Sequence, residues 1–177
     1  MNLTVSSRLK LQLGDITTMT VDAVVNSTDP TLAAGGPVHV AIHRAAGPEL
    51  LAEVAKLEEC PPGQARLTSG HHLAAPFIIH TVAPTWMDGK EGEARILASC
   101  YRECLKLAAA ERIKTLAFPS LGSGPMPQIP LEVAAPVAIG TILDFLREHE
   151  FPKEVVLVCF TIPTYQIHQK ILKEAMP

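Results

Sequence analysis

The residues best suited to chemistry lie between Val24 and Gly47. An apolar, strand-like run passes there through small and turn-forming residues with a Gly-Gly-Pro sequence, and then enters an alanine-rich helix. Two histidines, His39 and His43, lie four residues apart where that helix is expected to begin. Three interpretations fit this pattern: a phosphate cradle, a catalytic centre, or a tight connection in a packed core.

The spacing of His39 and His43 also suits two metal ligands on one helix face. A catalytic zinc site normally has three protein ligands, and no third ligand is evident in the sequence. His71 and His72 belong to a different loop, and adjacent residues on a strand point to opposite faces. We therefore expect no metal and no cofactor in this chain, and we expect His80 to be a buried histidine with satisfied hydrogen bonds.

Two glycine-containing loops each precede a predicted helix. One contains Gly35 and Gly36, and the other runs from Ser120 to Pro127. Small residues allow the backbone to approach a ligand, and the N-terminus of a helix presents unpaired N–H groups. The alternative is that the glycines only turn the chain. Neither loop is a Walker or a dinucleotide-binding motif, so these residues alone indicate an anion or nucleotide site.

Strand-like and helical patterns alternate along the whole chain. We predict strands over residues 8–13, 22–26, 76–84, 115–119 and 154–160, a strand followed by a turn within 65–74, and helices over 38–46, 49–59, 91–112, 131–149 and 164–175. This order predicts one α/β domain spanning residues 1–177, a three-layer α/β/α sandwich around a mixed, mostly parallel sheet. Ligands gather beyond the carboxyl ends of such strands, where residues 14–17, 26–43 and 120–127 are expected to lie.

Two of the predicted helices carry more specific expectations. Within 91–112, one face is shared by Leu97, Cys100, Tyr101, Cys104, Leu105 and Ala108, which predicts that this face is buried. Pro136 falls inside the 131–149 helix and lacks a backbone N–H. It is therefore expected to kink that helix or to delay its start.

Composition excludes several classes of protein. The chain has 177 residues, of which 47% are hydrophobic and 19% charged, a balance typical of a globular domain rather than a disordered one. The net charge of −3 lacks the basic excess of a protein that binds nucleic-acid backbones. We therefore expect no direct nucleic-acid partner, and an anion would be held by backbone N–H groups.

The cysteines and the hydropathy pattern indicate the compartment. Cys60, Cys100, Cys104 and Cys159 form no CxxC pair, so reduced, buried thiols are expected. No apolar run approaches the roughly 18 residues that a membrane span needs, and no signal peptide is evident. These features predict a cytoplasmic protein, or a nuclear one in a eukaryote, with no membrane partner.

Several segments together resemble the macro domain, the ADP-ribose-binding module. They are LGDIT, VDAVVNSTDPTLAAGGPVHVAIHRAAGPEL, ARLTSGHHLAAPFIIHTVAP, LASCYRECLKLA, LAFPSLGSG and EVVLVCF, which occur in the family's order from about Leu11 to the end of the chain. The resemblance implies a three-layer α/β/α fold, in agreement with the pattern of elements. It also implies a partner, which is ADP-ribose or an ADP-ribosylated protein.

The resemblance implies ligand-binding residues at both loops. Asp15 would accept a hydrogen bond from the adenine amino group and Ile16 would donate its N–H, although Asp15 also suits a turn or a helix cap. Phe160 would lie beside adenine, unless it is an ordinary core residue. The remaining implied ligand-binding residues are Asn26, Gly35, Gly36 and Val38 in the first loop region and Ser120, Gly122, Ser123 and Gly124 in the second.

The sequence departs from the family where catalysis is expected. In members that hydrolyse ADP-ribosyl esters, an Asn, an Asp and a His cluster near the distal ribose. The matching residues here are Asp29, His39 and His43. Either the hydrolytic arrangement is lost, or Asp29 raises the basicity of His39 and the two form a new acid–base pair. A protonated His39 would meet an unfavourable helix dipole, which favours the first interpretation.

Three functions follow from this comparison. The first is binding of free or protein-linked mono-ADP-ribose, and the second is hydrolysis, either of ADP-ribose from acidic side chains or of the acetyl ester in O-acetyl-ADP-ribose. The third is an interaction domain whose pocket is vestigial. Pro37, Val40 and the Pro-Met-Pro sequence at 125–127 favour the third function, because they replace small residues or constrict the loops.

Overall fold

The strands form one six-stranded sheet with the order β1-β6-β5-β2-β4-β3 within the described part of the chain. The computed structural model describes residues 4–123 and 128–176, with Ser6 described by its backbone only. The strands are β1 (Leu9–Leu13), β2 (Ala23–Ser27), β3 (Ala65–Ser69), β4 (Phe77–Thr81), β5 (Thr115–Pro119) and β6 (Glu154–Cys159). Only the β3–β4 pairing is antiparallel, which confirms the predicted mixed, mostly parallel sheet.

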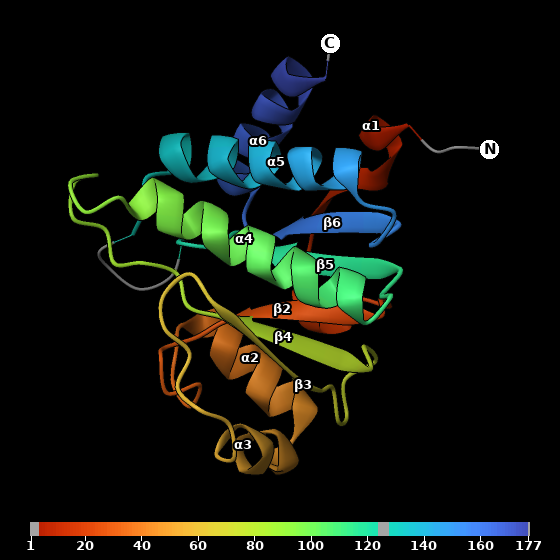
Figure 1. Cartoon of the computed structure of the whole chain (residues 1–177), viewed down its shortest axis with the longest axis vertical. Helices are drawn as coiled ribbons and strands as arrows, with labels where there is room; N and C mark the ends of the chain where they lie inside the picture. Colours follow the sequence, from red (N-terminus) through yellow and green to blue (C-terminus); the bar gives the residue numbers. More distant parts are fainter. Residues whose placement is uncertain (1–3, 124–127, 177) are drawn as a thin grey trace.

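Helices cover both faces of the sheet (Figure 1). They are α1 (Val5–Arg8), the 3₁₀ helix η1 (Ile16–Thr18), α2 (Pro37–Ala46), α3 (Pro48–Val54), α4 (Glu93–Ala110), α5 (Leu131–Glu148) and α6 (Ile162–Ala175). One buried cluster contains the apolar faces of α4 and α5, and a second, separate cluster contains those of α2 and α3 with Ile16 of η1. The predicted three-layer α/β/α sandwich is therefore confirmed.

The central strands are apolar because helices cover them on both sides. Residues 23–26 of β2 are all buried, and Val24 and Val25 belong to different core clusters on opposite faces of the sheet. β-Branched residues pack well on such a pleated surface. Polar residues inside this strand, such as Asn26, therefore need partners within the protein.

The predicted helices agree with the structure at their centres and differ at their ends. All six residues predicted to share a face of α4 are buried. Pro136 does not delay α5, which begins at Leu131 and continues past it. The helix predicted over 49–59 ends at Val54, because the next residues form tight turns in which Leu57 N–H bonds to Val54 O. The short helix α1 was not predicted.

The strands β2 and β5 separate toward their carboxyl ends. Their pairing consists of Ala23 with Leu116 and Val24 with Ala117, and it does not extend to Asn26 or Pro119. The helix that follows β2 covers one face of the sheet, and the helix that follows β5 covers the other. Where the connections after two neighbouring strands go to opposite faces of a sheet, a crevice opens between the strand ends, and α/β proteins bind ligands there.

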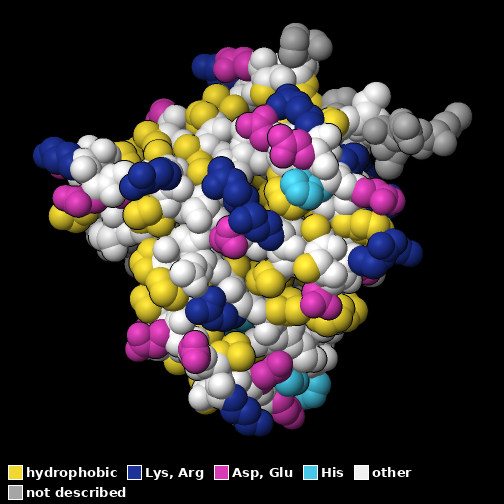
Figure 2. Space-filling model, viewed as in Figure 1, with side chains coloured by type: hydrophobic (Ala, Val, Ile, Leu, Met, Phe, Trp, Pro, Cys, Tyr) yellow, Lys and Arg dark blue, Asp and Glu magenta, His cyan; other side chains and the backbone are white. Residues whose placement is uncertain are grey.

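The outer surface over α4 and α5 carries charges of both signs. Figure 2 shows Lys and Arg side chains interspersed with Asp and Glu on this face. No helix among the described residues is both long enough and apolar enough to cross a membrane.

Arg8 ties the turn between α5 and β6 to the start of β1. Its guanidinium donates to the backbone carbonyl of Leu146 in the last turn of α5 and to those of four residues in the connection that follows, which are His149, Glu150, Pro152 and Lys153. Burial lowers the pKa of Arg8, while the nearby Glu150 carboxylate opposes that change. One buried cation thus satisfies carbonyls at the C-terminus of α5, where the helix dipole favours positive charge.

Replacing Arg8 should destabilise the whole fold. We expect Arg8→Met to lower the free energy of unfolding by about 3 kcal/mol, because several buried carbonyls lose a charged donor. Urea denaturation followed by circular dichroism measures this change. Arg102→Met is the matched control, since Arg102 is exposed on α4. Equal stabilities for the two variants would contradict this role of Arg8.

Candidate functional site

The predicted ligand-binding residues lie in a row along the carboxyl edge of the sheet. In strand order, Asp15 follows β1, Phe160 follows β6, Ser120 follows β5, and Asn26 lies near the end of β2. These four strands are adjacent, and neighbouring strands lie about 4.8 Å apart. The row therefore suits an elongated ligand that crosses the ends of several strands.

Asp15 caps a short helix at one end of this row. Its Oδ1 accepts hydrogen bonds from the backbone N–H of Thr17, at 2.8 Å, and from the Thr17 hydroxyl, at 2.7 Å. The cap interpretation is therefore confirmed. The other oxygen, Oδ2, makes no hydrogen bond with the described residues, so it remains available to a ligand. Ile16 is 6% exposed and packs in the core beneath this cap.

Phe160 is not a core residue. It lies directly after β6 and is 78% exposed, the largest exposed fraction among the big apolar side chains of the described chain. The adjacent β1 ends beside it, because Gly14 N–H donates to Cys159 O. The exposed phenyl ring and the carboxylate of Asp15 thus flank the joined ends of two neighbouring strands.

The first glycine loop is shaped by Asp29. The Asp29 carboxylate accepts hydrogen bonds from the Thr31 hydroxyl and from Ala34 N–H, and the Asp29 N–H donates to Ala34 O. The loop then turns tightly over α2, since a Cβ on Gly35 would lie 2.7 Å from the Cβ of His39. Only glycine fits at position 35 without displacing this contact.

The first loop leads into an uncapped helix N-terminus. Gly36 is the N-cap of α2 and makes no side-chain cap hydrogen bond, and Pro37 follows as the first helical residue. The backbone N–H groups of Val38 and His39 occupy the next two positions of the first turn. Such N–H groups have no partner within a helix and attract anions.

A buried chain of hydrogen bonds runs beneath this loop. Asn26 is fully buried, and its Nδ2 lies 3.2 Å from His39 Nδ1 and 3.1 Å from His80 Nδ1. The His80 Nε2 lies 2.8 Å from the Thr68 hydroxyl. An amide nitrogen with two hydrogens donates to both rings when each Nδ1 is an acceptor. The proton of each ring is then on Nε2.

The three imidazoles of this region are held in their neutral form. Burial is the main cause in each case. Burial, together with a smaller effect of the neighbouring histidines, lowers the pKa of His80 to about 3 and that of His43 to about 4. Burial also lowers the pKa of His39, although a hydrogen bond with the Ala33 backbone and the charge of Asp29 oppose it. The His39 and His43 rings stack with centroids 4.1 Å apart.

The structure does not join Asp29 to His39 by a hydrogen bond. The carboxylate of Asp29 is used within its own loop, and the His39 Nδ1 faces Asn26. His39 is only 4% exposed, so burial outweighs the effect of Asp29 on its pKa. The charge of Asp29 still acts to raise the His39 pKa, so the acid–base pair considered for the sequence stays a prediction.

Unpartnered polar atoms gather at the crevice. Among the described residues, four buried side-chain N or O atoms have no hydrogen-bond partner. Three of them belong to the predicted site: Asn26 Oδ1 on β2, His43 Nε2 on α2 and Ser120 Oγ after β5. Buried polar atoms are nearly always hydrogen-bonded, so a group of unpartnered ones at a strand-edge crevice indicates a place for polar ligand atoms.

The second glycine loop faces the first from β5. The Ser123 hydroxyl and N–H both bond to Ser120 O, and Ile129 N–H bonds to Gly122 O. Gly122 has a φ of +83°, and a Cβ there would lie 2.8 Å from Ile129 Cδ1, so this turn also requires glycine. Gly124 and the Pro-Met-Pro sequence at 125–127 lie outside the described residues.

The sequence predicted that His80 is buried and hydrogen-bonded, but it did not predict which residues His80 contacts. His80 is a buried histidine with both ring nitrogens partnered, as predicted. Its contact with Asn26 arises because the two residues are paired across β2 and β4. Alternation within the β4 segment places His80 on the same face as Ile78, but the register between strands cannot be derived from that pattern. All four cysteines are buried and free, as expected.

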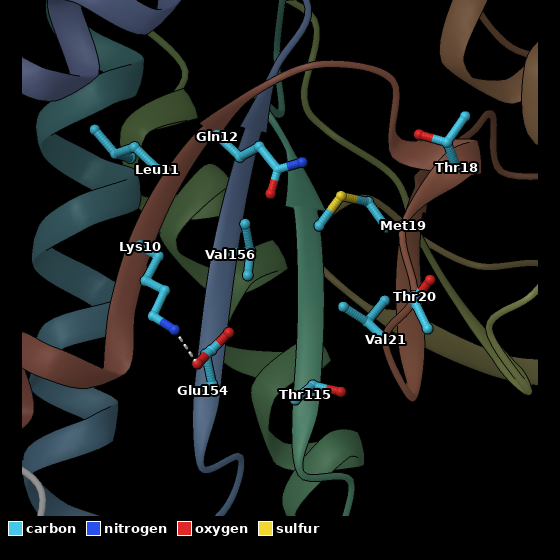
Figure 3. A pocket seen from close by; sticks show the side chains of 10 residues that line it. All are labelled: Lys10, Leu11, Gln12, Thr18, Met19, Thr20, Val21, Thr115, Glu154 and Val156. Atoms are coloured by element: carbon cyan, nitrogen blue, oxygen red, sulfur yellow. Dashed lines mark hydrogen bonds and ion pairs between the residues drawn. The ribbon is translucent and has the colours of Figure 1, made fainter.

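Other candidate sites in the structure are weaker. No group of three or more His, Cys, Asp or Glu residues within the described ranges is arranged to hold a metal ion. A pocket of about 470 Å³ lies on the sheet face formed by β1, β5 and β6 (Figure 3). It contains Lys10, Thr115 and Glu154 from the amino ends of these strands, so it lies apart from the two glycine loops.

The buried histidines should make folding stability depend on pH. Below pH 6.5 an unfolded chain binds a proton at His80, whereas the folded chain does not until pH falls to about 3. The unfolded state thus binds more protons in this interval, and stability falls as pH decreases. We expect His80 alone to account for about 2 kcal/mol of lost stability at pH 5 relative to pH 7.5.

Urea denaturation of His80→Gln at these two pH values tests this expectation. The variant should lose about 2 kcal/mol less than the unmodified chain between pH 7.5 and pH 5. His72→Gln, which alters an exposed histidine of the β3–β4 loop, should keep the original difference. A His80→Gln variant with unchanged pH dependence would contradict the prediction.

Known proteins share this sequence and this fold. A sequence model described as Macro domain matches residues 25–138. A macro domain-containing protein from Methanosarcina mazei is 46% identical over 169 residues, which cover 96% of this chain and 90% of the relative. An O-acetyl-ADP-ribose deacetylase from Enterobacter sp. (strain 638) is 42% identical, with 93% of each chain covered.

A solved structure has the same fold as this chain. A mutant of the Oceanobacillus iheyensis macrodomain, solved with ADPR, matches with a TM-score of 0.92 and 36% sequence identity, covering 99% of this chain and 98% of that one. The resemblance predicted from the sequence is thus confirmed in both sequence and fold. The chain belongs to the macro domain family.

Proposed function

We propose that this protein binds ADP-ribose, free or attached to a protein, across the carboxyl edge of the sheet. The observation that carries the proposal is the group of unpartnered atoms at the crevice, Asn26 Oδ1, His43 Nε2 and Ser120 Oγ. Asn26 and Ser120 lie at the carboxyl ends of β2 and β5, which separate there, and His43 lies on α2, the helix that follows the first glycine loop. The O. iheyensis macrodomain, which has the same fold, was solved with ADPR.

Each part of the ligand has a candidate partner in this row. Asp15 Oδ2 is an acceptor for the adenine amino group, and the exposed ring of Phe160 provides an apolar surface beside it. The uncapped N-terminus of α2 suits the negative charge of the diphosphate. The distal ribose would lie over Asn26 and His43: Asn26 Oδ1 would accept a hydrogen bond from a hydroxyl group, and His43 Nε2 would accept or donate one according to its tautomer.

Hydrolysis of ADP-ribosyl esters is the second candidate. It is favoured by relatives such as the Enterobacter protein, which is named an O-acetyl-ADP-ribose deacetylase. The site itself favours binding, because His39 is buried and faces Asn26, and because the carboxylate of Asp29 holds its own loop. A general base must reach the proton that it removes, and the buried imidazole of His39 suits that role less well than the carboxylate that hydrolytic family members carry at this position.

Calorimetric titration tests the binding proposal directly. We expect saturable binding of ADP-ribose with a micromolar dissociation constant, about −8 kcal/mol, and weaker binding of AMP and ADP. Gly35→Ala should weaken ADP-ribose binding at least about tenfold, because the added Cβ would meet His39 at 2.7 Å and displace the loop.

Gly140→Ala is the matched control for this titration. Gly140 lies in α5, and a Cβ there would meet nothing within 4 Å, so this variant should bind like the unmodified chain. The absence of any binding heat in the unmodified chain would indicate a vestigial pocket and would refute both the binding and the hydrolytic functions.

Restoring the residues of hydrolytic family members tests the second candidate. The double variant Asp29→Asn with His39→Asp should deacetylate O-acetyl-ADP-ribose at least about a hundredfold faster than the unmodified chain, because a positioned base typically contributes that much. Product release followed by chromatography measures the rate. If the unmodified chain already turns over as fast as the double variant, hydrolysis becomes the better assignment.

A further inference from the structure

We propose that the Tyr101 hydroxyl positions the second glycine loop for its ligand by accepting a hydrogen bond from the backbone N–H of Leu121. The proposal rests on the proposed function, because this loop forms one wall of the same crevice. Tyr101 is a positioning residue here, and it acts on the ligand only through the loop.

The geometry places the hydroxyl just beyond the end of β5. Tyr101 lies on α4 and is 1% exposed, and its ring packs against that of Phe118 with centroids 5.0 Å apart. Phe118 is the next-to-last residue of β5. The Tyr101 ring therefore extends along the strand, and its Oη reaches Leu121 N at 3.2 Å.

Both partners of this hydrogen bond are removed from water. Leu121 is fully buried, and a buried backbone N–H without a partner is strongly unfavourable. Burial raises the pKa of Tyr101, although the Leu121 hydrogen bond opposes that change. The phenol is therefore neutral. It supplies the acceptor for Leu121 N–H that a neighbouring strand would supply if β5 continued past Pro119.

Two neighbouring residues hold α4 in the position that this contact requires. The Ser99 hydroxyl donates to Gly63 O at 2.8 Å, and the Cys100 thiol donates to Val82 O at 3.2 Å. Val82 directly follows β4. Three consecutive residues of α4 thus bind the backbone of three separate segments, and Tyr101 is the one that reaches the glycine loop.

The Leu121 contact fixes the backbone of the residues next to it, Ser120 and Gly122. Gly122 follows Leu121 directly, and its carbonyl accepts from Ile129 N–H. Ser120 precedes Leu121, and its Oγ is buried and unpartnered. Loss of the hydroxyl would leave the buried Leu121 N–H without an acceptor. We expect the backbone to shift to restore a hydrogen bond, which would displace Ser120 and Gly122.

Tyr101→Phe removes only the hydroxyl and keeps the packing against Phe118. We expect ADP-ribose to bind about tenfold more weakly to this variant, through faster dissociation, at a temperature where both proteins are folded. Amide hydrogen exchange measured by NMR should quicken at least about tenfold at Leu121 relative to Leu116 and Ala117 of β5. Tyr165→Phe, the same change on α6, should alter neither quantity.

The two measurements separate this proposal from the proposed function. A lower unfolding temperature with unchanged exchange at Leu121 and unchanged ADP-ribose dissociation would reduce Tyr101 to a stabilising residue and overturn the proposal. If the unmodified chain does not bind ADP-ribose, the proposed function fails. The part of Tyr101 in fixing the loop is then decided by exchange at Leu121 alone: faster exchange supports it, and unchanged exchange overturns it.

Discussion

The side-chain amide of Asn26 holds the sheet, α2 and the first glycine loop in one arrangement. Its nitrogen lies between the Nδ1 atoms of His39 and His80 in a fully buried position. One amide donates to two rings only where both are neutral, and burial lowers the pKa of each ring. His80 extends this chain of hydrogen bonds to Thr68 on β3. Burial keeps the rings neutral, and the hydrogen bonds of the neutral His80 ring link the three strands.

The separation of β2 and β5 converts this buried arrangement into a site. Asn26 lies beyond the last paired residues of these strands, so its Oδ1 is left without a partner at the crevice. Because the following helices cover opposite faces, both glycine loops reach this point from different sides. The loops also use glycine for a common reason, since a side chain at Gly35 or Gly122 would collide with a neighbour.

The unusual residues of the first loop contribute to its structure. Asp29 closes the turn through Thr31 and Ala34, and His39 fills the space between Gly35 and Asn26. A loop that depends on these contacts retains its shape and its uncapped helix N-terminus. The same contacts occupy the Asp29 carboxylate and the His39 Nδ1 with partners inside the protein.

The sequence by itself determined the alternation of elements, the buried face of α4 and the resemblance to the macro domain family. Hydrophobic periodicity depends only on residues that are close in the chain, so it can be recognised from the sequence alone. Ordered segments such as the LGDIT and SLGSG sequences also predicted which loops face the ligand edge. Local patterns did not predict α1 or the early end of α3, because short helical turns depend on their neighbours more than on periodicity.

Only the tertiary structure decided how the candidate residues are used. The contact of Asn26 with His80 depends on strand register, and the contact of Tyr101 with Leu121 joins residues on a helix and a distant loop. Residue type alone would suggest that Phe160 is buried and that His39 is exposed, whereas the structure shows the opposite for both. Burial and strand register depend on the packing of segments that are far apart in the chain. Burial lowers the pKa values of His39 and His43, and the packing leaves Asn26 Oδ1, His43 Nε2 and Ser120 Oγ without hydrogen-bond partners.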